Sequence, residues 1–432
     1  MSTINLYLID MSHATNTSGV DRYVSTLIGG LQNSSNVNVH WIHLRHDSGL
    51  LFSKEDQIKH YTKYTIPLPQ QYNTIIAERF WIRKYNEQVY RLTEHLFEGK
   101  ENCIIHLHTL NLIDLAVFIR EHTGCKVVTH LHCIPWKGLY NSDKKRFNKL
   151  YELTYTAKGE GEKQTSEKYV TNNCELQSYS APDALVCVTH CAVDFLENCI
   201  LHYSDNIHVI PNGINDLAFH SEKRVQKTKN DTFHCLYVGV VSESKGVKYI
   251  LKALNLVKQQ GYKISLTIAG TCNPVFRQEV KQDYPDLNVD VKGRIPFDEL
   301  KILYRESDIG VIASLQEQAS YVAIEMAMFG LPIVTTAVDG LDEIFTDELN
   351  ALKVPTKFSS VFGLSVDVEA MASQIIRLIV NGNLREKLSK NVRNLYEQEL
   401  NLELMMKRTV KVYKRLCDEE KSQNKYISYE HP

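Results

Sequence analysis

Short apolar runs alternate with amphipathic segments along most of the chain. In the first half, five such runs are each followed by polar residues or a helical pattern: Ile4–Ile9, Val37–Leu44, Cys103–Leu107, Lys126–Leu131 and Ala184–Val188. Runs that are apolar throughout are typical of parallel strands, because helices cover both faces of such a sheet. The first half therefore predicts a parallel sheet between two layers of helices.

A second series of the same kind begins at Ile207 with a short strand that ends in a turn signal. The segment Ile207–Gly213 ends in Pro-Asn-Gly, and a polar stretch follows it through Asp231. The later apolar runs are Phe233–Val238, Lys263–Ala269, Leu287–Val291, Asp308–Ala313, Ile333–Thr336 and Ala351–Val354. Two series separated by a polar linker predict two doubly wound α/β domains. A chain of 432 residues agrees with this, because a single core of that size is uncommon.

Other segments depart from the alternation. Residues 143–179 are rich in Lys, Glu, Thr and Asn, which predicts an exposed, partly helical insertion. The segment Leu384–Cys417 has apolar residues three and four apart, which predicts a long helix, and Asp418–Pro432 predicts a frayed polar tail. The predicted organisation is a first domain, a linker, a second domain, the helix and the tail, over residues 1–204, 205–232, 233–383, 384–417 and 418–432.

Composition and charge exclude several classes of protein. A hydrophobic share of 43% and a net charge of −2 describe a globular protein without the basic excess of a nucleic-acid binder. No apolar run reaches the 18 residues of a membrane-spanning helix, and the first residues lack the basic region of a signal peptide. The ten cysteines form no CxxC pairs and lie in apolar runs, which favours free thiols in the cytoplasm.

Two glutamates eight positions apart lie between two predicted strands. Glu317 precedes a predicted helix and Glu325 lies on its second turn. A strand, loop, helix and strand in this order direct the loop to the carboxyl edge of a parallel sheet. Open α/β sheets bind ligands at that edge, where the N–H groups of a helix start favour an anion. A sugar nucleotide carries both phosphate and hydroxyl groups. Glu325 could therefore bind a ribose and Glu317 a hexose, while backbone N–H groups between them hold the phosphate.

A structural interpretation of the same stretch is also open. Glutamate is common at helix starts because the helix dipole favours it, and Ser314 or Ser320 could be a plain N-cap.

The stretch from Glu317 to Pro332 resembles the E-x7-E signature of retaining glycosyltransferases of family 4, which have the GT-B fold. It keeps seven residues of the family pattern: Glu317, Val322, Glu325, Met326, Ala327, Gly330 and Pro332. It departs from the pattern over residues 318–321, where the family has small, flexible residues facing the donor sugar. The resemblance implies that Ser320, Tyr321, Val322 and Glu325 bind the donor and that Glu317 takes part in catalysis.

A second segment resembles the family pattern G-R-L-x-x-E-K-G, in which the arginine and the lysine bind the donor diphosphate. Gly239 and Lys245 match the pattern, and Val240 stands at the arginine position. The resemblance implies that both matching residues bind the donor and that Lys245 is also catalytic, because it stabilises the leaving diphosphate. A charged hydrogen bond to phosphate is worth about 1.5–3 kcal/mol, so this difference matters for activity. Lys245 and helix N-termini would have to suffice, or Arg22 or Arg294 would replace the missing cation. Without the resemblance, the segment is a glycine-flanked turn with a surface lysine.

Two weaker matches follow the family order. The segment Gly293–Pro296 resembles the family loop whose backbone reads the nucleobase, which makes Arg294 a candidate donor contact. The segment Thr17–Val24 resembles the first glycine-rich loop, with Gly19 and Arg22 near the donor and Ser18 in place of a glycine. Each is a plain turn before a helix in the structural interpretation.

The histidines lie at two predicted strand ends. The segment Val128–His132 fits the family pattern V-x-T-x-H, whose histidine reaches the donor sugar, so His132 is the catalytic candidate and His130 the alternate. Alternation along the strand predicts that both rings lie on the same side of the sheet. His108 resembles part of the family segment I-x-H-x-H and would shape the cleft. Together with His106 these residues also suggest a zinc site, which needs three ligands. The resemblance implies metal-independent transfer, so we expect no metal and no cofactor.

The resemblance implies an α/β protein of the GT-B type: two Rossmann-like domains with a cleft between them and a C-terminal helix that crosses back to the first. It implies a cytoplasmic, retaining glycosyltransferase that moves a sugar from a nucleoside diphosphate donor, most simply a UDP- or GDP-sugar. The acceptor is open among a saccharide, a lipid-linked glycan, a peptide and a small molecule, and so is peripheral contact with the inner membrane face. No nucleic acid is expected. The alternative, raised by Val240 and the altered loop, is an inactive GT-B subunit that binds sugar nucleotide or stabilises another enzyme.

Overall fold

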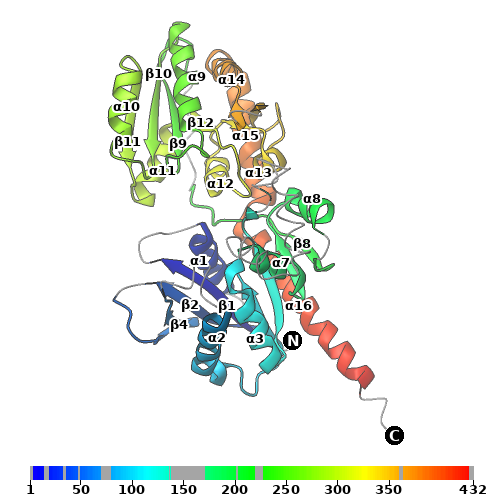
Figure 1. Cartoon of the computed structure of the whole chain (residues 1–432). Helices are drawn as coiled ribbons and strands as arrows, with labels where there is room; N and C mark the ends of the chain where they lie inside the picture. Colours follow the sequence, from blue (N-terminus) through cyan, green and yellow to red (C-terminus); the bar gives the residue numbers. More distant parts are fainter. Residues whose placement is uncertain are drawn as a thin grey trace. The chain divides into compact units, whose positions relative to one another are not determined.

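The computed structural model describes residues 3–13, 19–32, 36–46, 49–69, 79–135, 137, 171–200, 203–218, 227–359 and 363–427. The chain forms two compact units, which are described separately. Unit 1 comprises Met1–Pro211 and Glu403–Pro432, and unit 2 comprises Asn212–Leu402. Figure 1 shows both units, with many of their elements labelled. No helix in the described ranges is long and apolar enough to cross a membrane.

Unit 1 is built on an eight-stranded sheet with the order β3-β4-β2-β1-β5-β6-β7-β8. Neighbouring strands are parallel, except that β3 and β4 form an antiparallel pair at one edge. The strands are β1 (Ile4–His13), β2 (Val37–His46), β3 (Lys54–Ile58), β4 (Tyr61–Pro67), β5 (Cys103–Leu107), β6 (Lys126–Leu131), β7 (Ala184–Cys187) and β8 (Ile207–Val209). The five predicted strands are present. The β3–β4 hairpin was not predicted, because β3 is a polar, mostly exposed edge strand without an apolar run.

The boundary of unit 1 differs from the predicted one. The segment Ile207–Val209 was expected to open the second series, but it pairs with β7 in the register Leu185↔Ile207 and completes the first sheet. Unit 1 therefore extends to Pro211 rather than ending at residue 204. Most of the predicted insertion lies outside the described residues, and its last part forms α7 (Thr171–Ser180).

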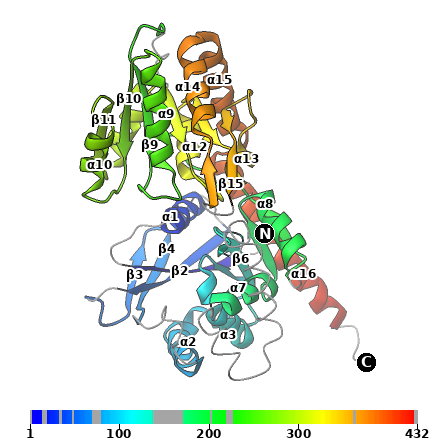
Figure 2. The same ribbon diagram turned by 45° about the horizontal axis from the view of Figure 1, so that its top comes forward.

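The sheet of unit 1 has helices on both faces. Its helices are α1 (Gly19–Leu31), α2 (Arg79–Thr93), α3 (Ile113–Thr123), α7, α8 (His190–Cys199) and α16 (Leu402–Ile427), with short 3-10 turns η2 (Glu94–Leu96) and η3 (Leu110–Leu112). On one face, Ile9, Ile105 and Val127 pack with apolar residues of α2 and α3. Figure 2 shows α1 on the opposite side of the sheet from α2 and α3.

Unit 2 has a six-stranded parallel sheet with the order β11-β10-β9-β12-β13-β14. Its strands are β9 (Phe233–Val238), β10 (Ile264–Ala269), β11 (Asn288–Gly293), β12 (Ile309–Ile312), β13 (Ile333–Thr336) and β14 (Leu352–Val354), and a small hairpin joins β15 (Thr356–Ser359) to β16 (Gly363–Val366). The helices are α9 (Val247–Gln259), α10 (Phe276–Asp283), α11 (Phe297–Glu306), α12 (Tyr321–Met328), α13 (Asp339–Ile344), α14 (Val368–Val380) and α15 (Gly382–Glu399). Two separate apolar clusters form the core of this unit. All six strands predicted for this half are present.

The predicted long helix over residues 384–417 is two helices. α15 ends at Glu399, and Asn401 makes a short parallel bridge with Ile214 before α16 begins. α15 belongs to unit 2, where Leu388 and Val392 are buried, and α16 belongs to unit 1 from Glu403 onward. The predicted frayed tail is also helical as far as Ile427. Most of the charged residues there are good helix formers, so α16 continues past Cys417.

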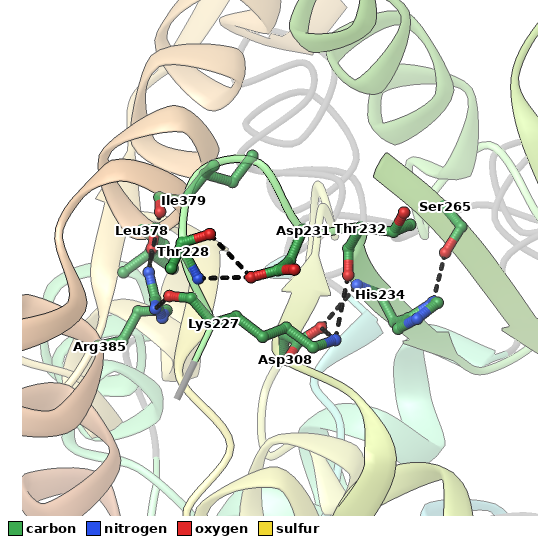
Figure 3. Close-up of polar contacts among 10 residues, drawn as sticks. All are labelled: Lys227, Thr228, Asp231, Thr232, His234, Ser265, Asp308, Leu378, Ile379 and Arg385. Atoms are coloured by element: carbon green, nitrogen blue, oxygen red, sulfur yellow. Dashed lines mark hydrogen bonds and ion pairs between the residues drawn. The ribbon is translucent and has the colours of Figure 1, made fainter. Parts of the chain in front are cut away.

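The end of the linker is held to unit 2 by a polar network (Figure 3). Arg385 donates hydrogen bonds to the carbonyl groups of Leu378 (2.5 Å) and Ile379 (2.9 Å), at the end of α14, and to that of Lys227 (2.7 Å). The Lys227 ammonium group in turn donates to Asp308 Oδ2 at 2.7 Å. One guanidinium group therefore joins the linker to the last turn of α14.

Replacing Arg385 with methionine should lower the free energy of unfolding of unit 2 by about 2–3 kcal/mol, because three carbonyl groups lose a charged donor. The guanidinium group also stacks over the Phe233 ring at 4.8 Å, so lysine should restore only part of the loss. Urea denaturation measures the change. Lys390→Met, at an exposed position of the same helix, is the matched control. An equal loss in both variants would contradict the role of the network.

Candidate functional site

The strand order of unit 2 places a ligand site between β9 and β12. From β9 the chain builds outward through β10 to β11, and from β12 it builds in the other direction through β13 to β14. Ligands of open α/β sheets bind at the carboxyl ends of the strands where the direction of winding reverses. The segments that follow β9 and β12 carry Lys245 and Glu317.

Lys245 and Glu317 form an ion pair at this position. The Lys245 ammonium group lies 2.5 Å from Glu317 Oε2, and the Ser314 hydroxyl donates to the same oxygen at 3.4 Å. The Lys245 side chain is 35% exposed and that of Glu317 is 13% exposed. The structure therefore brings two of the three predicted catalytic residues together, with the ammonium group accessible to a ligand.

Two glycines allow the loops around this pair to touch. Gly246 has a φ of +68°, and a Cβ atom there would lie 2.0 Å from the carbonyl oxygen of Ala313. A Cβ atom on Gly340 would lie 1.8 Å from the carbonyl oxygen of Gln318, and the Gly340 N–H donates to the carbonyl of Glu317 at 2.8 Å. Larger residues would push the loops apart, so these glycines keep the ion pair in place.

The segment after β9 presents no second cation at the predicted arginine position. Val240 is 57% exposed, and its carbonyl accepts a hydrogen bond from Tyr237 at 2.8 Å. Burial and the negative charge of Glu317 raise the pKa of Tyr237, so its hydroxyl stays protonated and donates. Gly239, at the end of β9, donates its N–H to the carbonyl of Ala269.

The two arginines proposed as substitutes follow other strands, β11 and β1. Arg294 follows β11 at the edge of the sheet, and β10 separates that strand from β9. Arg22 lies in the first turn of α1, in unit 1, as does Gly19 at the helix start. Thr17 and Ser18 of the predicted glycine-rich loop lie outside the described residues. Contacts of Gly19, Arg22 and Arg294 with a donor stay predictions.

The start of α12 shows how Ser320, Tyr321 and Val322 are used in the folded chain. Ser320 is the N-cap, because its hydroxyl oxygen accepts a hydrogen bond from the Ala323 N–H at 3.2 Å. Tyr321 and Val322 pack against an apolar cluster of unit 2. Tyr321 and Val322 are only partly buried, and the predicted donor contacts of Ser320, Tyr321 and Val322 stay predictions.

Glu325 has a structural partner that no sequence pattern indicated. Its side chain is 1% exposed, and Oε2 accepts a hydrogen bond from the Tyr304 hydroxyl at 2.7 Å. Tyr304 comes from α11 and is itself fully buried. The contact ties α11 to α12, and the predicted bonds of Glu325 to a ribose stay a prediction.

In unit 1, four histidines gather at the ends of β5 and β6. The His130 and His132 rings stack at 4.2 Å, so alternation along the strand was a correct guide to their common side. His132 Nε2 lies 3.1 Å from His108 Nδ1, and His106 Nδ1 lies 2.6 Å from the Tyr413 hydroxyl of α16. His132 is partly exposed, whereas the other three are buried.

Burial controls the charge of this group. It lowers the pKa of His106 and of His132 to about 3. Burial, together with the neighbouring histidines, also places the pKa values of His108 and His130 well below the usual histidine value. All four imidazoles are therefore neutral near pH 7, and His132 is available as a neutral hydrogen-bonding group.

Comparisons with known proteins agree with this architecture. The family described as "Glycosyl transferases group 1" matches residues 219–395, and "Glycosyltransferase Family 4" matches residues 17–216. An uncharacterized glycosyltransferase of Methanocaldococcus jannaschii is 28% identical over 223 residues, which span 49% of this chain and 54% of that relative. The chain thus aligns with about half the length of this relative.

Solved structures share the fold over nearly the whole chain. Sucrose-phosphate synthase from Thermosynechococcus elongatus has a TM-score of 0.69 at 18% identity, covering 96% of this chain and 99% of that one. Anabaena HepE in complex with UDP and glucose has a TM-score of 0.65 at 13% identity, covering 95% and 100%. The two family matches together extend over both units, and the chain belongs to the group 1 glycosyltransferases of the family 4 type, with the GT-B fold.

Proposed function

We propose that the protein transfers a sugar from a nucleoside diphosphate donor to an acceptor, with retention of the anomeric configuration. The observation that carries this proposal is the Lys245–Glu317 pair at the carboxyl ends of β9 and β12. A cation next to a carboxylate at a switch point suits a ligand that has both phosphate and hydroxyl groups.

Lys245 would stabilise the leaving diphosphate. Negative charge accumulates on the diphosphate as the glycosidic bond breaks, and fixed positive groups directed at that charge lower the barrier. The N–H groups at the start of α12 would add to the ammonium group. We propose that this cation and these N–H groups serve the diphosphate without a metal ion or cofactor there. Arg22 and Arg294 are proposed as additional donor contacts.

Glu317 would have two tasks. One carboxylate oxygen holds the Lys245 ammonium group, and the other could accept hydrogen bonds from hydroxyl groups of the donor sugar. Glu325 would bind the ribose. His132 is proposed to contact the sugar as a neutral imidazole whose ring is oriented by His108. Retention follows from the family resemblance, in which the departing phosphate assists attack from its own side of the sugar.

A UDP-sugar is the first donor to test, with a GDP-sugar as the second. The support is the fold shared with Anabaena HepE, whose structure contains UDP and glucose. The cytoplasm is the proposed location, because the nine cysteines whose side chains the structure describes are free thiols. A lipid-linked acceptor would bring the protein to the inner membrane face, and a saccharide, a peptide or a small molecule would not require this.

A thermal-shift panel with UDP, GDP, ADP, TDP and their common sugar conjugates tests the donor site. A nucleotide at 100 times its dissociation constant should stabilise the protein by about 2.7 kcal/mol, and we expect this for one base only. Slow release of the free nucleoside diphosphate from the matching sugar conjugate should accompany it. Binding without release would favour the inactive-subunit alternative, and absence of any shift would overturn the proposed donor.

A further inference from the structure

One face of the sheet in unit 1 carries a row of buried polar side chains. The pairing of β1 with β5 places Leu8 beside His106. Side chains alternate between the two faces of a sheet, so Asp10 and His108, each two residues further along its strand, lie on the same face as this pair. The pairing of β5 with β6 places Leu107 beside Thr129, and hence His108 beside His130. His106, His108 and His130 each offer one ring nitrogen as a possible metal ligand, and these three nitrogens lie within 4.8 Å of one another.

The nitrogen atoms of these histidines are buried without partners. The side chains of His106, His108 and His130 are 0%, 3% and 1% exposed. Across the described part of the chain, His106 Nε2, His108 Nε2 and both nitrogens of His130 make no hydrogen bond. Buried polar atoms nearly always have a hydrogen-bond partner, so a group of buried nitrogen atoms without partners requires an explanation.

The remaining ring nitrogens have partners that fix the orientation of two rings. His106 Nδ1 is held by the Tyr413 hydroxyl at 2.6 Å, and His108 Nδ1 by His132 Nε2 at 3.1 Å. Metal-binding histidines have this arrangement: one nitrogen faces the ion and the other is held by an outer partner. In both residues the nitrogen left for a ligand is therefore Nε2.

We propose that His106, His108 and His130 bind one divalent transition-metal ion, with Zn²⁺ as the first choice. Imidazole nitrogen suits zinc, copper or nickel, whereas magnesium and calcium prefer oxygen ligands. Ligand atoms on a tetrahedral zinc ion, with bonds of about 2.0–2.1 Å, lie about 3.3 Å apart, so small ring rotations must bring the three nitrogens together. A water molecule would take the fourth position.

Charge and position both favour this site. Three neutral imidazoles do not offset the positive charge of the ion. The carboxylate of the fully buried Asp10, which lies in the adjacent strand on the same face of the sheet, would offset part of it. Asp10 Oδ1 accepts from Trp41 and lies 2.6 Å from His43 Nδ1, whereas Oδ2 has no hydrogen-bond partner within the described ranges. The ion would tie β5 to β6 and, through His108, hold the His132 ring. The three ligands belong to unit 1, and none of them is a residue proposed to bind the diphosphate.

Metal binding by the purified full chain tests the proposal, without a polyhistidine tag, since a tag would itself bind the ion. The protein is freed of metal with a chelator and titrated with Zn²⁺ against a chromophoric competitor, and with Co²⁺ as a spectroscopic probe. We expect one ion per chain, the intense visible bands of four-coordinate Co²⁺ and a higher melting temperature with Zn²⁺.

Substitutions locate the ligands. His106→Gln, His108→Gln and His130→Gln should each weaken zinc binding by more than about 100-fold, and Tyr413→Phe, which removes an outer partner, by about 10-fold or more. His122→Gln, at an exposed position of α3, is the control and should bind as the parent chain does. Circular dichroism checks that each variant is folded.

A measurement on the unaltered chain keeps the proposal testable even if the variants do not fold. Zinc-edge X-ray absorption should show about three imidazole ligands at roughly 2.0–2.1 Å. Less than stoichiometric binding by the parent chain, or a different ligand set in the absorption spectrum, would overturn the site. Undiminished binding by folded His130→Gln would do the same, and the cluster would then be a packing feature around the buried Tyr23 ring, which contacts His108, His130 and His132.

Discussion

Replacing Lys245 with alanine should lower kcat/KM for glycosyl transfer by about 100- to 1000-fold, the loss typical of removing one preorganised group that stabilises charge in the transition state. The ammonium group is the cation that the structure places at the carboxyl ends of β9 and β12, and it is accessible to a ligand. Val240 supplies no charge at the arginine position, so we expect the chain to depend strongly on Lys245. Steady-state kinetics with the donor identified by the thermal-shift panel measures the effect.

Three further variants make this result specific. Lys248→Ala, at an exposed position in the first turn of α9, removes the same charge without touching Glu317 and should keep nearly full activity. Lys245→Arg should recover part of the loss. Glu317→Gln should also reduce turnover, because it removes the carboxylate that holds the ammonium group. Unchanged turnover and donor affinity in Lys245→Ala would show that the diphosphate is bound elsewhere.

Replacing Glu325 with alanine should lower the free energy of unfolding by about 3 kcal/mol. The substitution removes the hydrogen bond from Tyr304, leaves that buried hydroxyl without this acceptor and opens a small cavity, and each effect costs about 1–3 kcal/mol. Chemical denaturation of unit 2 measures the change. A loss of donor binding in this variant is therefore not by itself evidence for a ribose contact.

A double-mutant cycle separates the two roles of Glu325. Tyr304→Phe removes the same hydrogen bond but keeps the carboxyl group, so it should destabilise the fold and leave donor affinity nearly unchanged. The coupling between Tyr304→Phe and Glu325→Ala should be about 0.5–3 kcal/mol. Glu299→Ala, at an exposed position of α11, serves as the control. Additive effects of the two substitutions would show that the contact contributes little.

Buried parallel strands were the most predictable elements. Most strands of unit 2 are compact runs of mainly apolar residues next to a helical pattern, because both faces of the sheet are covered. The edge strand β11 instead alternates exposed and partly buried residues. Edge strands and helix ends were less predictable. The β3–β4 hairpin is too polar to show as an apolar run, and the break between α15 and α16 at Asn401 depends on a bridge to Ile214 that no local pattern shows.

The residues at strand ends could be named from the sequence, but their partners could not. Lys245 and Glu317 were both candidates, yet their ion pair depends on β9 lying beside β12. Glu325 was also a candidate, whereas its partner Tyr304 stood out in no motif. The same holds for His106, whose partner Tyr413 comes from the C-terminal helix.

The sequence by itself determined the two series of buried strands, the family and the residue types at the strand ends. These follow from local periodicity and from short motifs, which are readable along the chain. Only the tertiary structure decided which of those residues meet and which are buried. Strand order and helix packing bring together positions far apart in the sequence, and the environment that sets the charge and partners of each side chain exists only after those contacts have formed.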